Sequence, residues 1–389
     1  MTIHKYINMP SLEIQPTCIT IFPPDDRGRS KYFHGRSEIR SRFLRRLNHY
    51  NAINGGSIFL VTGPPGAGKS ALLYMLGEDA EDLGWNVKMD ITPEHFTSPL
   101  LMAKCLSVKL KHTTTRSTSI DAKVLQQSWG TSRILGAAIA DVMRTAASAR
   151  PLLLVLDEAQ ELSTIADILE DRKVASAAMG LLHNGKLGYP VVLLAGGLDT
   201  SREVLSAFGM SRITNENRAR IGALSMESTR EVIRAYVLGE TGIDIPEQWV
   251  EPIAKKTQGW PQHIVCYSGG AATKVSTLQH APSDSDLKDI VTYGRSSQVS
   301  YYEERTHDFD WEALRCIAGV FETITVGGST TRSVIENALK EVYTQEQTKD
   351  IFTRALRQGV ITGTAYGKYT IPIPSMHSWL TSEFGPSRI

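Results

Sequence analysis

The sequence lacks the features of a membrane or secreted protein. No apolar run approaches the roughly 18 residues that mark a membrane-spanning helix. The N-terminal stretch MTIHKYINMPSLEIQP contains no apolar signal core. Cys18, Cys105, Cys266 and Cys316 are widely spaced without a Cys-x-x-Cys motif, which favours free thiols in a reducing compartment. We therefore predict a cytoplasmic protein with no membrane contact.

The sequence also has little net charge. Its 42 Lys and Arg against 41 Asp and Glu give +1 at pH 7, so the whole chain has no general attraction for nucleic acid. The charge is uneven, because residues 27–46 contain eight Lys or Arg and one acidic residue, Glu38. This stretch could bind phosphates. Alternatively, it is a solvated helix face with an extended basic lead-in, which we favour.

A glycine-rich loop stands between two apolar segments in SIFLVTGPPGAGKSALLYML, residues 57–76. The run Ile58–Val61 is typical of a strand buried on both faces, and the residues after the loop favour a helix. This context supports the phosphate-binding pattern Gly-x-x-x-x-Gly-Lys-Ser. The predicted nucleotide-binding residues are Gly63, Pro64, Pro65, Gly66, Ala67, Gly68, Lys69, Ser70 and Ala71.

The chemistry of phosphate binding explains these residue types. Gly66 and Gly68 have no Cβ, so backbone N–H groups can close around phosphate oxygens. The helix that begins near Lys69 directs its positive dipole end at the same anion. Lys69 would reach the β- and γ-phosphates, and the Ser70 hydroxyl would bind Mg²⁺.

A second motif, PLLLVLDE, ends an apolar strand in two carboxylates. Asp157 suits the Mg²⁺ shell, and Glu158 is placed to polarise an attacking water. An apolar strand that merely ends in acidic turn residues is the alternative, which the preceding glycine loop makes the weaker one. The two motifs predict a site that binds ATP with Mg²⁺ and hydrolyses it.

The rest of the chain predicts the fold class. Alternating apolar runs and amphipathic segments up to residue 224 predict an α/β P-loop NTPase, a parallel sheet with helices on both faces. Expected strands are 58–61, 85–90, 151–156, 191–195 and 218–224, and expected helices are 37–49, 97–111, 132–147, 175–183 and 201–208, with a polar surface excursion at 112–130.

Two further domains are predicted beyond the sheet. Consecutive helices from Ser225 predict a helical lid, and three helices followed by a two-strand hairpin predict a winged helix. The predicted boundaries are an N-terminal arm at 1–30, the P-loop domain at 31–224, the lid at 225–304 and the winged helix at 305–389.

Seven segments together resemble a known family. They are FHGRSEI, GPPGAGKS, LLLVLDEAQEL, VVLLAGGLDTS, FGMSRITNENRARIGALS, QGWPQHI and GVITGTAYGKYTIPIPSMHSWL. The chain resembles the AAA+ ATPases, especially the origin-recognition initiator branch and its STAND-like bacterial relatives, over about residues 30–389.

The resemblance implies further site residues. Arg36 would flank the adenine, and Pro261 and His263 of the lid motif would contact nucleotide. Trp260 and His263 are alternatively residues of the lid core, which is the more common role for such side chains. Arg212, predicted to end the helix before the last strand, would act as the arginine finger of a neighbouring subunit, with Arg218 and Arg220 as the other candidates. Each of the three is alternatively an ordinary surface arginine. The lid motif has no arginine after Gly259, and the first polar residues after the fourth strand are Asp199 and Thr200.

Three functions fit these observations. The first is an ATP-controlled switch that assembles with copies of itself, hydrolyses ATP slowly and controls a partner protein that supplies the effect. The second is a DNA-binding ATPase of initiator or transposition-regulator type. Residues 301–389 hold nine basic and eleven acidic residues, a charge of −2, whereas DNA-reading modules are usually basic. The third, a scaffold that scarcely turns nucleotide over, is disfavoured by the intact Asp157–Glu158 pair.

Overall fold

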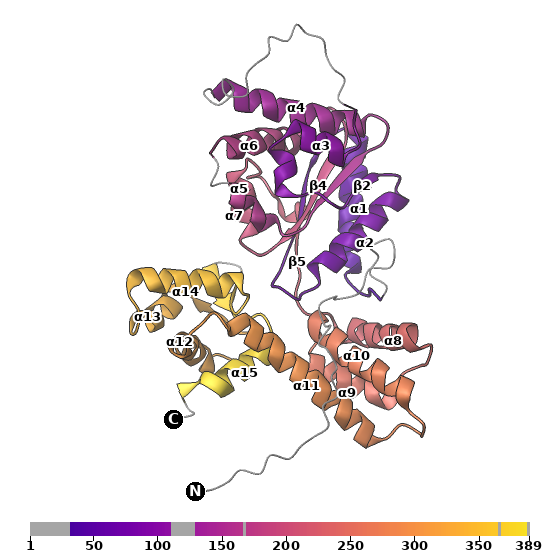
Figure 1. Cartoon of the computed structure of the whole chain (residues 1–389), viewed down its shortest axis with the longest axis vertical. Coiled ribbons are helices and arrows are strands. Elements are labelled where there is room, and N and C mark those ends of the chain that lie inside the picture. The colour runs from indigo at the N-terminus through magenta and orange to yellow at the C-terminus, as the bar shows by residue number, and fades with distance from the viewer. Residues whose placement is uncertain (1–31, 110–128, 166–168, 365–366, 387–389) are drawn as a thin grey trace.

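The chain folds into a sheet domain, a helical lid and a winged helix (Figure 1). The structure is a computed structural model that describes residues 32–109, 129–165, 169–364 and 367–386. The predicted arm at 1–30 and most of the polar excursion lie outside the described residues, while residues 129 and 130 begin a helix. No helix among the described residues has the length and apolar character needed to cross a membrane. Cys105, Cys266 and Cys316 form no disulfide, and Cys18 is not described.

The sheet domain contains five parallel strands in the order β2-β3-β4-β1-β5. The three central strands are continuous apolar runs with every strand residue buried except Thr62, because helices cover both faces. The edge strand β5 ends earlier than predicted, although the Ile221 N–H still bonds the Thr62 carbonyl at 2.8 Å. The strands are β1 (Ser57–Thr62), β2 (Asn86–Lys88), β3 (Leu152–Leu156), β4 (Val191–Gly197) and β5 (Arg218–Arg220).

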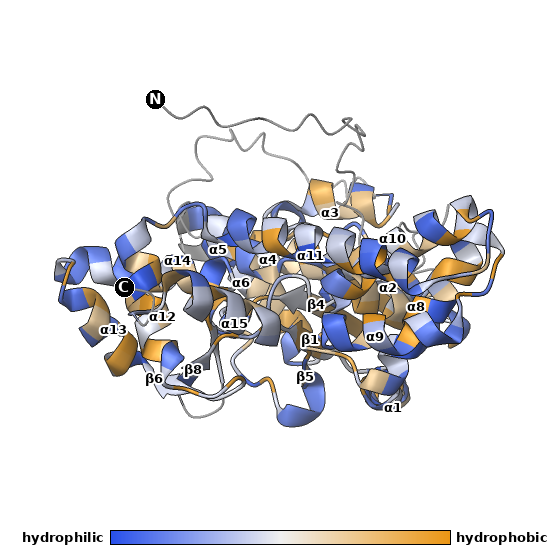
Figure 2. Ribbon diagram, turned by 90° about the horizontal axis from the view of Figure 1, so that it is seen from below, coloured by the Kyte–Doolittle hydropathy of each residue, from blue (hydrophilic) through white to orange (hydrophobic). Residues whose placement is uncertain are grey.

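Alternate side chains of each strand enter different cores. Phe59 and Val61 pack with the first two helices of the chain, whereas Ile58 and Leu60 pack with the helices of the opposite face. Figure 2 shows β1 and β4 in the interior, between helices on which hydrophilic and hydrophobic residues alternate. The helices are α1 (Ser37–Ala52), α2 (Lys69–Asp82), α3 (Pro99–Cys105), α4 (Trp129–Ala147), α5 (Leu162–Ile165), α6 (Leu169–His183) and α7 (Ser201–Ala207).

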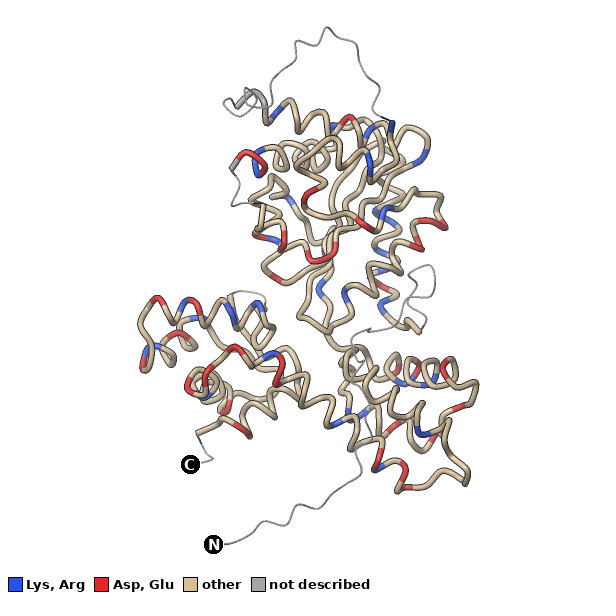
Figure 3. Tube along the Cα trace, viewed as in Figure 1, with Lys and Arg blue, Asp and Glu red and all other residues tan. Residues whose placement is uncertain are grey.

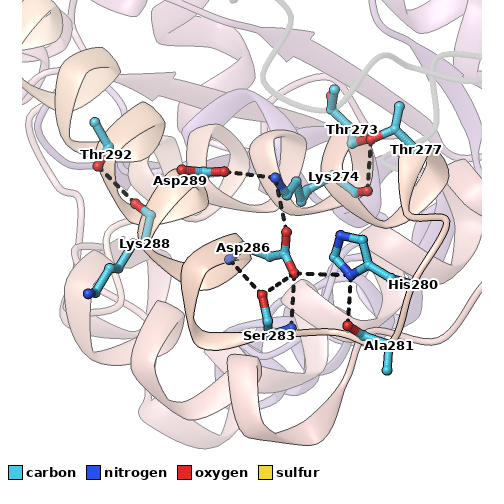
Figure 4. A network of polar contacts seen from close by, with 10 residues as sticks. All are labelled: Thr273, Lys274, Thr277, His280, Ala281, Ser283, Asp286, Lys288, Asp289 and Thr292. Atoms are coloured by element: carbon cyan, nitrogen blue, oxygen red, sulfur yellow. Dashed lines mark hydrogen bonds and ion pairs between the residues drawn. The ribbon is translucent and has the colours of Figure 1, made fainter.

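The lid is a four-helix unit with its own core. Ser225 caps its first helix by accepting the Ser228 N–H at 3.1 Å. Ser283 and Asp286 form a capping box at the last one (Figure 4). The helices are α8 (Met226–Thr241), α9 (Glu247–Thr257), α10 (Pro261–Thr277) and α11 (Asp284–Thr306).

The last part has the predicted helices and one additional strand. Its small sheet has three strands in the order β6-β8-β7, whereas the sequence predicted a two-strand hairpin. The first strand was missed because two threonines carry no periodic signal. The elements are α12 (Trp311–Glu322), β6 (Thr330–Thr331), α13 (Arg332–Lys340), α14 (Gln345–Arg357), β7 (Thr362–Gly363), β8 (Lys368–Thr370) and α15 (Pro374–Phe384).

One hydrophobic cluster joins the sheet domain to the winged helix. It runs from the α1–α2 face through Ala67, Trp260 and Tyr302 to the winged-helix core. Helix α11 crosses the predicted domain border between Glu304 and Arg305 and ends at Thr306. The end of α11 therefore lies against the carboxyl edge of the sheet, where ligands of open parallel sheets bind.

Candidate nucleotide site

The phosphate-binding loop folds as its sequence predicts. Gly66 and Gly68 have φ of 75° and 86°, which glycine adopts without strain, and α2 begins at Lys69. The Lys69 side chain is 6% exposed, and its Nζ donates to the Pro64 carbonyl at 3.3 Å. Burial lowers the pKa of Lys69, and the carboxylates of Glu158 and Asp157 oppose that shift. The loop thus holds a buried ammonium beside two carboxylates.

The strand β3 places the two carboxylates at the loop. Ser70 Oγ donates to Asp157 Oδ2 at 2.5 Å, and the Glu158 N–H donates to Asp157 Oδ1 at 2.9 Å. A hydroxyl and a carboxylate that meet in this way form the oxygen donor pair that Mg²⁺ prefers. Ser70 and Asp157 therefore fit the metal role predicted for them.

Gln160 holds the predicted base and was not found from the sequence. Its amide nitrogen donates to Glu158 Oε2, while its Oε1 accepts the Leu198 N–H and the Ser201 Oγ, both at 3.1 Å. Glu158 itself has the left-handed φ of 49°, which is uncommon for a residue with a side chain. The amide thus ties the Glu158 carboxylate to the end of β4. The only signal in the sequence was its position two residues after Glu158.

Arg36 and Pro261 line a small cavity beside the loop. The cavity is about 20 Å³, enough for about one water, so the lid is closed over it. The Arg36 guanidinium donates to the carbonyls of Gly222 and Ala223, and burial lowers its pKa. Its walls are mostly apolar, as a site for a base requires, but at this volume an adenine ring fits only after the walls separate. The walls are Phe33, His34, Arg36, Ala67, Gly68, Ala71, Leu224, Val232, Pro261 and Ile264.

His263 lies in the lid core rather than on this cavity. Its ring is fully buried, with Nδ1 3.0 Å from Gln298 Nε2 and with Tyr301 and Tyr302 both 5.7 Å away between ring centroids. Burial lowers the pKa of His263 to about 3, so the imidazole is neutral. Trp260 is also fully buried in the junction core. In this arrangement Pro261 lines the cavity, and His263 packs behind Tyr301.

The end of α11 adds residues that sequence analysis missed. Tyr301 Oη donates to the Pro65 carbonyl at 3.0 Å and accepts Arg305 Nη2 at 2.6 Å. Burial raises the pKa of Tyr301, so the hydroxyl keeps its proton. A Cβ on Gly66 would lie 2.2 Å from Tyr301 Oη, so only glycine fits there. In the sequence, the only signal for Tyr301 and Arg305 was their spacing of four residues, which places both on one face of a helix.

The three arginine-finger candidates have different surroundings. Arg212 lies beyond the end of α7 at Ala207, not at the end of a helix as predicted, and its side chain is exposed. Arg218 is exposed on β5. Arg220 is engaged within the chain, because it pairs with Asp199 at 3.0 Å and bonds Thr362 Oγ1 at 3.1 Å.

Residues 22–268 of the chain match a family model described as "Novel STAND NTPase 1" (nSTAND1). The chain belongs to this NTPase family. No curated protein matches the chain. The match confirms the predicted resemblance and the class of nucleotide-dependent enzyme.

Solved structures share the fold over nearly the whole nSTAND1 chain. A Walker-type ATPase of Pyrococcus abyssi is 12% identical with a TM-score of 0.53, covering 93% of this chain and 99% of that one. The ORC2 protein of Aeropyrum pernix is 11% identical with a TM-score of 0.53, covering 94% and 98%. That protein has also been solved in ADPNP–ADP complexes. At these identities the likeness shows the fold alone, and it confirms the predicted α/β sheet, helical lid and winged helix.

Proposed function

We propose that this nSTAND1 protein is an ATP-controlled molecular switch that assembles with ATP, hydrolyses it slowly and controls a partner protein. The contact between the phosphate loop and the lid junction carries this proposal. The Tyr301 hydroxyl bonds the Pro65 carbonyl, and a Cβ on Gly359 of the winged helix would lie 2.6 Å from Pro65 Cδ. A nucleotide bound at the loop would therefore act on the junction at which the lid and the winged helix move relative to the sheet domain.

The site residues divide the work of the proposed ATP hydrolysis. Lys69 binds the phosphates, Ser70 and Asp157 hold Mg²⁺, and Glu158 polarises the attacking water. Mg²⁺, when bound, neutralises charge on the phosphate oxygens. Arg212 is the arginine finger in this proposal, because its exposed side chain is available to a neighbouring subunit while Arg220 is held by Asp199.

The test uses Glu158→Gln with Glu161→Gln as the control, since Glu161 is exposed on the same turn. We expect Glu158→Gln to bind ATP but to hydrolyse it about 10²- to 10⁴-fold more slowly. Light scattering after size exclusion should show assembly with ATP and not with ADP. Retained turnover would remove Glu158 from its role, and equal size with both nucleotides would contradict the switch.

A DNA-binding ATPase remains the second candidate, because the structure forms a basic groove. The groove is about 850 Å³ and lies between β5 and the wing. Its cations come from distant segments and are Arg42, Arg202, Arg218, Arg220 and Lys368, against the acidic Asp199 and Glu203. Elsewhere on the winged helix both signs of charge are interspersed (Figure 3), so phosphate contacts would concentrate in this groove.

Fluorescence anisotropy with a labelled duplex tests this second candidate. Lys186→Glu is the matched control, since Lys186 is exposed near the amino end of β4, away from the groove. The double variant Arg218→Glu/Lys368→Glu should weaken salt-dependent binding, whereas the control should not. No binding by the unaltered protein, with or without ATP, would eliminate the candidate.

A further inference from the structure

A buried guanidinium lies beside the phosphate loop, and the described residues offer it no counter-ion. Arg305 is 9% exposed, in the last turn of α11. Its Nη2 donates to Tyr301 Oη, its Nη1 donates to the Gln358 carbonyl at 2.5 Å, and its Cζ is 4.2 Å from the Tyr301 ring centroid. Over the described part of the chain, no carboxylate forms an ion pair with it. A buried charge is costly unless it is paired, so this arrangement points to an anionic ligand.

The guanidinium lies close to the first residues of the loop. A Cβ on Gly359 would lie 3.0 Å from Arg305 Nη1 and 2.6 Å from Pro65 Cδ, so both groups approach the same small volume. Pro65 also accepts the Tyr301 hydroxyl that Arg305 bonds. Lys69, which bonds the adjacent Pro64 carbonyl, has its pKa lowered first by burial and further by Arg305. Two cations therefore flank the Pro64–Pro65 segment.

The direction of the phosphate chain identifies which phosphate Arg305 would meet. The cavity for the base is lined by Gly68 and Ala71, whereas Pro65 and Arg305 are not among its walls. Ser70, bonded to Asp157, marks where the metal and the reacting phosphate lie. The chain of phosphates thus runs from the cavity towards the carboxylates, and the terminal phosphate comes nearest to the Pro64–Pro65 end.

We propose that Arg305 binds the terminal phosphate of ATP and, in doing so, gives up its bond to the Gln358 carbonyl of the winged helix. The inference rests on the proposed ATP switch and names the residue that reads the nucleotide. Arg305 would take the place of the arginine that the lid motif Gly259–His263 lacks. Arg305 belongs to α11 and bonds the residue that follows α14, so a γ-phosphate would compete directly with a contact that holds the winged helix.

The test compares ATP and ADP affinities in the Glu158→Gln background, by titration calorimetry. We expect Arg305→Ala to weaken ATP binding about 10- to 100-fold, the worth of a hydrogen bond to a charged group, and to change ADP binding little. Arg305→Lys keeps the charge without the planar fork and should give an intermediate loss. Arg295→Ala is the matched control, because Arg295 is exposed on the same helix.

Equal losses for ATP and ADP, or no loss for ATP, would overturn the inference. If Arg305→Ala does not fold, Arg305→Lys decides, since it must still reduce the preference for ATP over ADP. Failure of the switch proposal looks different. In that case Glu158→Gln binds ATP but stays the same size with ATP and ADP, whatever residue 305 is.

Discussion

The two ends of helix α11 carry polar clusters of opposite kinds. At the amino end Asp286 accepts from Ser283 and pairs with Lys274 at 3.1 Å, and Lys274 also pairs with Asp289 at 2.7 Å (Figure 4). At the carboxyl end Arg305 bonds the Tyr301 hydroxyl and the Gln358 carbonyl, and it pairs with no carboxylate among the residues that the structure describes. The first cluster pairs its charges within the protein. The second leaves a buried positive charge unbalanced.

This difference separates a structural cluster from a ligand-binding one. A capping box with paired charges satisfies the open N–H groups of a helix and needs nothing further. An unbalanced cation at a phosphate loop needs an anion, because desolvation is not repaid by neutral oxygens. We therefore expect changes at the amino end to alter stability, and changes at the carboxyl end to alter nucleotide binding.

The largest expected effect comes from the loop that the carboxyl end serves. Lys69→Ala should reduce affinity for ATP and ADP by at least about 100-fold, because the loop loses its buried point charge to the phosphates. Folding should survive, since a buried ammonium contributes a desolvation cost. Titration calorimetry with both nucleotides measures this, with Lys104→Ala as an exposed control on α3. Near-normal ADP binding would contradict this expectation and show that the loop backbone binds the phosphates without Lys69.

Two adjacent tyrosines at the carboxyl end of α11 bond different parts of the protein. The Tyr301 hydroxyl bonds the phosphate loop, whereas the Tyr302 hydroxyl donates to Ser375 Oγ at 2.6 Å. Tyr301→Phe should weaken ATP binding about 2- to 10-fold, because it loosens both Pro65 and Arg305. Tyr302→Phe should lower the thermal midpoint without changing ATP affinity. Identical effects of the two variants on ATP affinity would mean that the junction acts only by packing.

Local chemistry explains what the sequence could predict. The loop and the Asp157–Glu158 pair are each formed by consecutive residues, so spacing alone identified them. The alternation of apolar runs with amphipathic segments predicted a parallel sheet, and the bounds of the central strands lie close to those of the apolar runs. The order of the strands has no such local signal. The start of α8 could be found because the cap at Ser225 is a local feature too.

Long-range geometry explains what could not be predicted. His263 was grouped with Pro261, yet two residues along a helix turn about 200°, so a helix that turns Pro261 to the cavity turns His263 away. Arg305 lies next to Pro65 only because α11 crosses from the lid to the loop. An arginine near the end of an amphipathic helix looks like any dipole-balancing cation in the sequence.

The smallest expected effect is at the amino end of α11. Asp286→Asn keeps the size of the side chain but removes the charge that pairs with Lys274 and accepts from Ser283. We expect the thermal midpoint to fall by a few degrees, with unchanged ATP and ADP affinity. A change in nucleotide preference from this variant would mean that both ends of α11 serve the ligand.

Acid titration isolates the contribution of the charge at Asp286. The hydrogen bonds from Ser283, together with Lys274, lower the pKa of Asp286 to about 2, below the value of about 3.9 for an unfolded aspartate. The carboxylate therefore stabilises the fold above about pH 4, and this stabilisation is lost as the pH falls towards 2. Urea unfolding of the original protein and of Asp286→Asn between pH 6 and pH 3 should show a stability difference that narrows with acid, because the aspartate of the unfolded chain becomes protonated below about pH 4 while the folded one stays charged. A difference that stays constant over this range would place the effect in the shape of the cap and not in its charge.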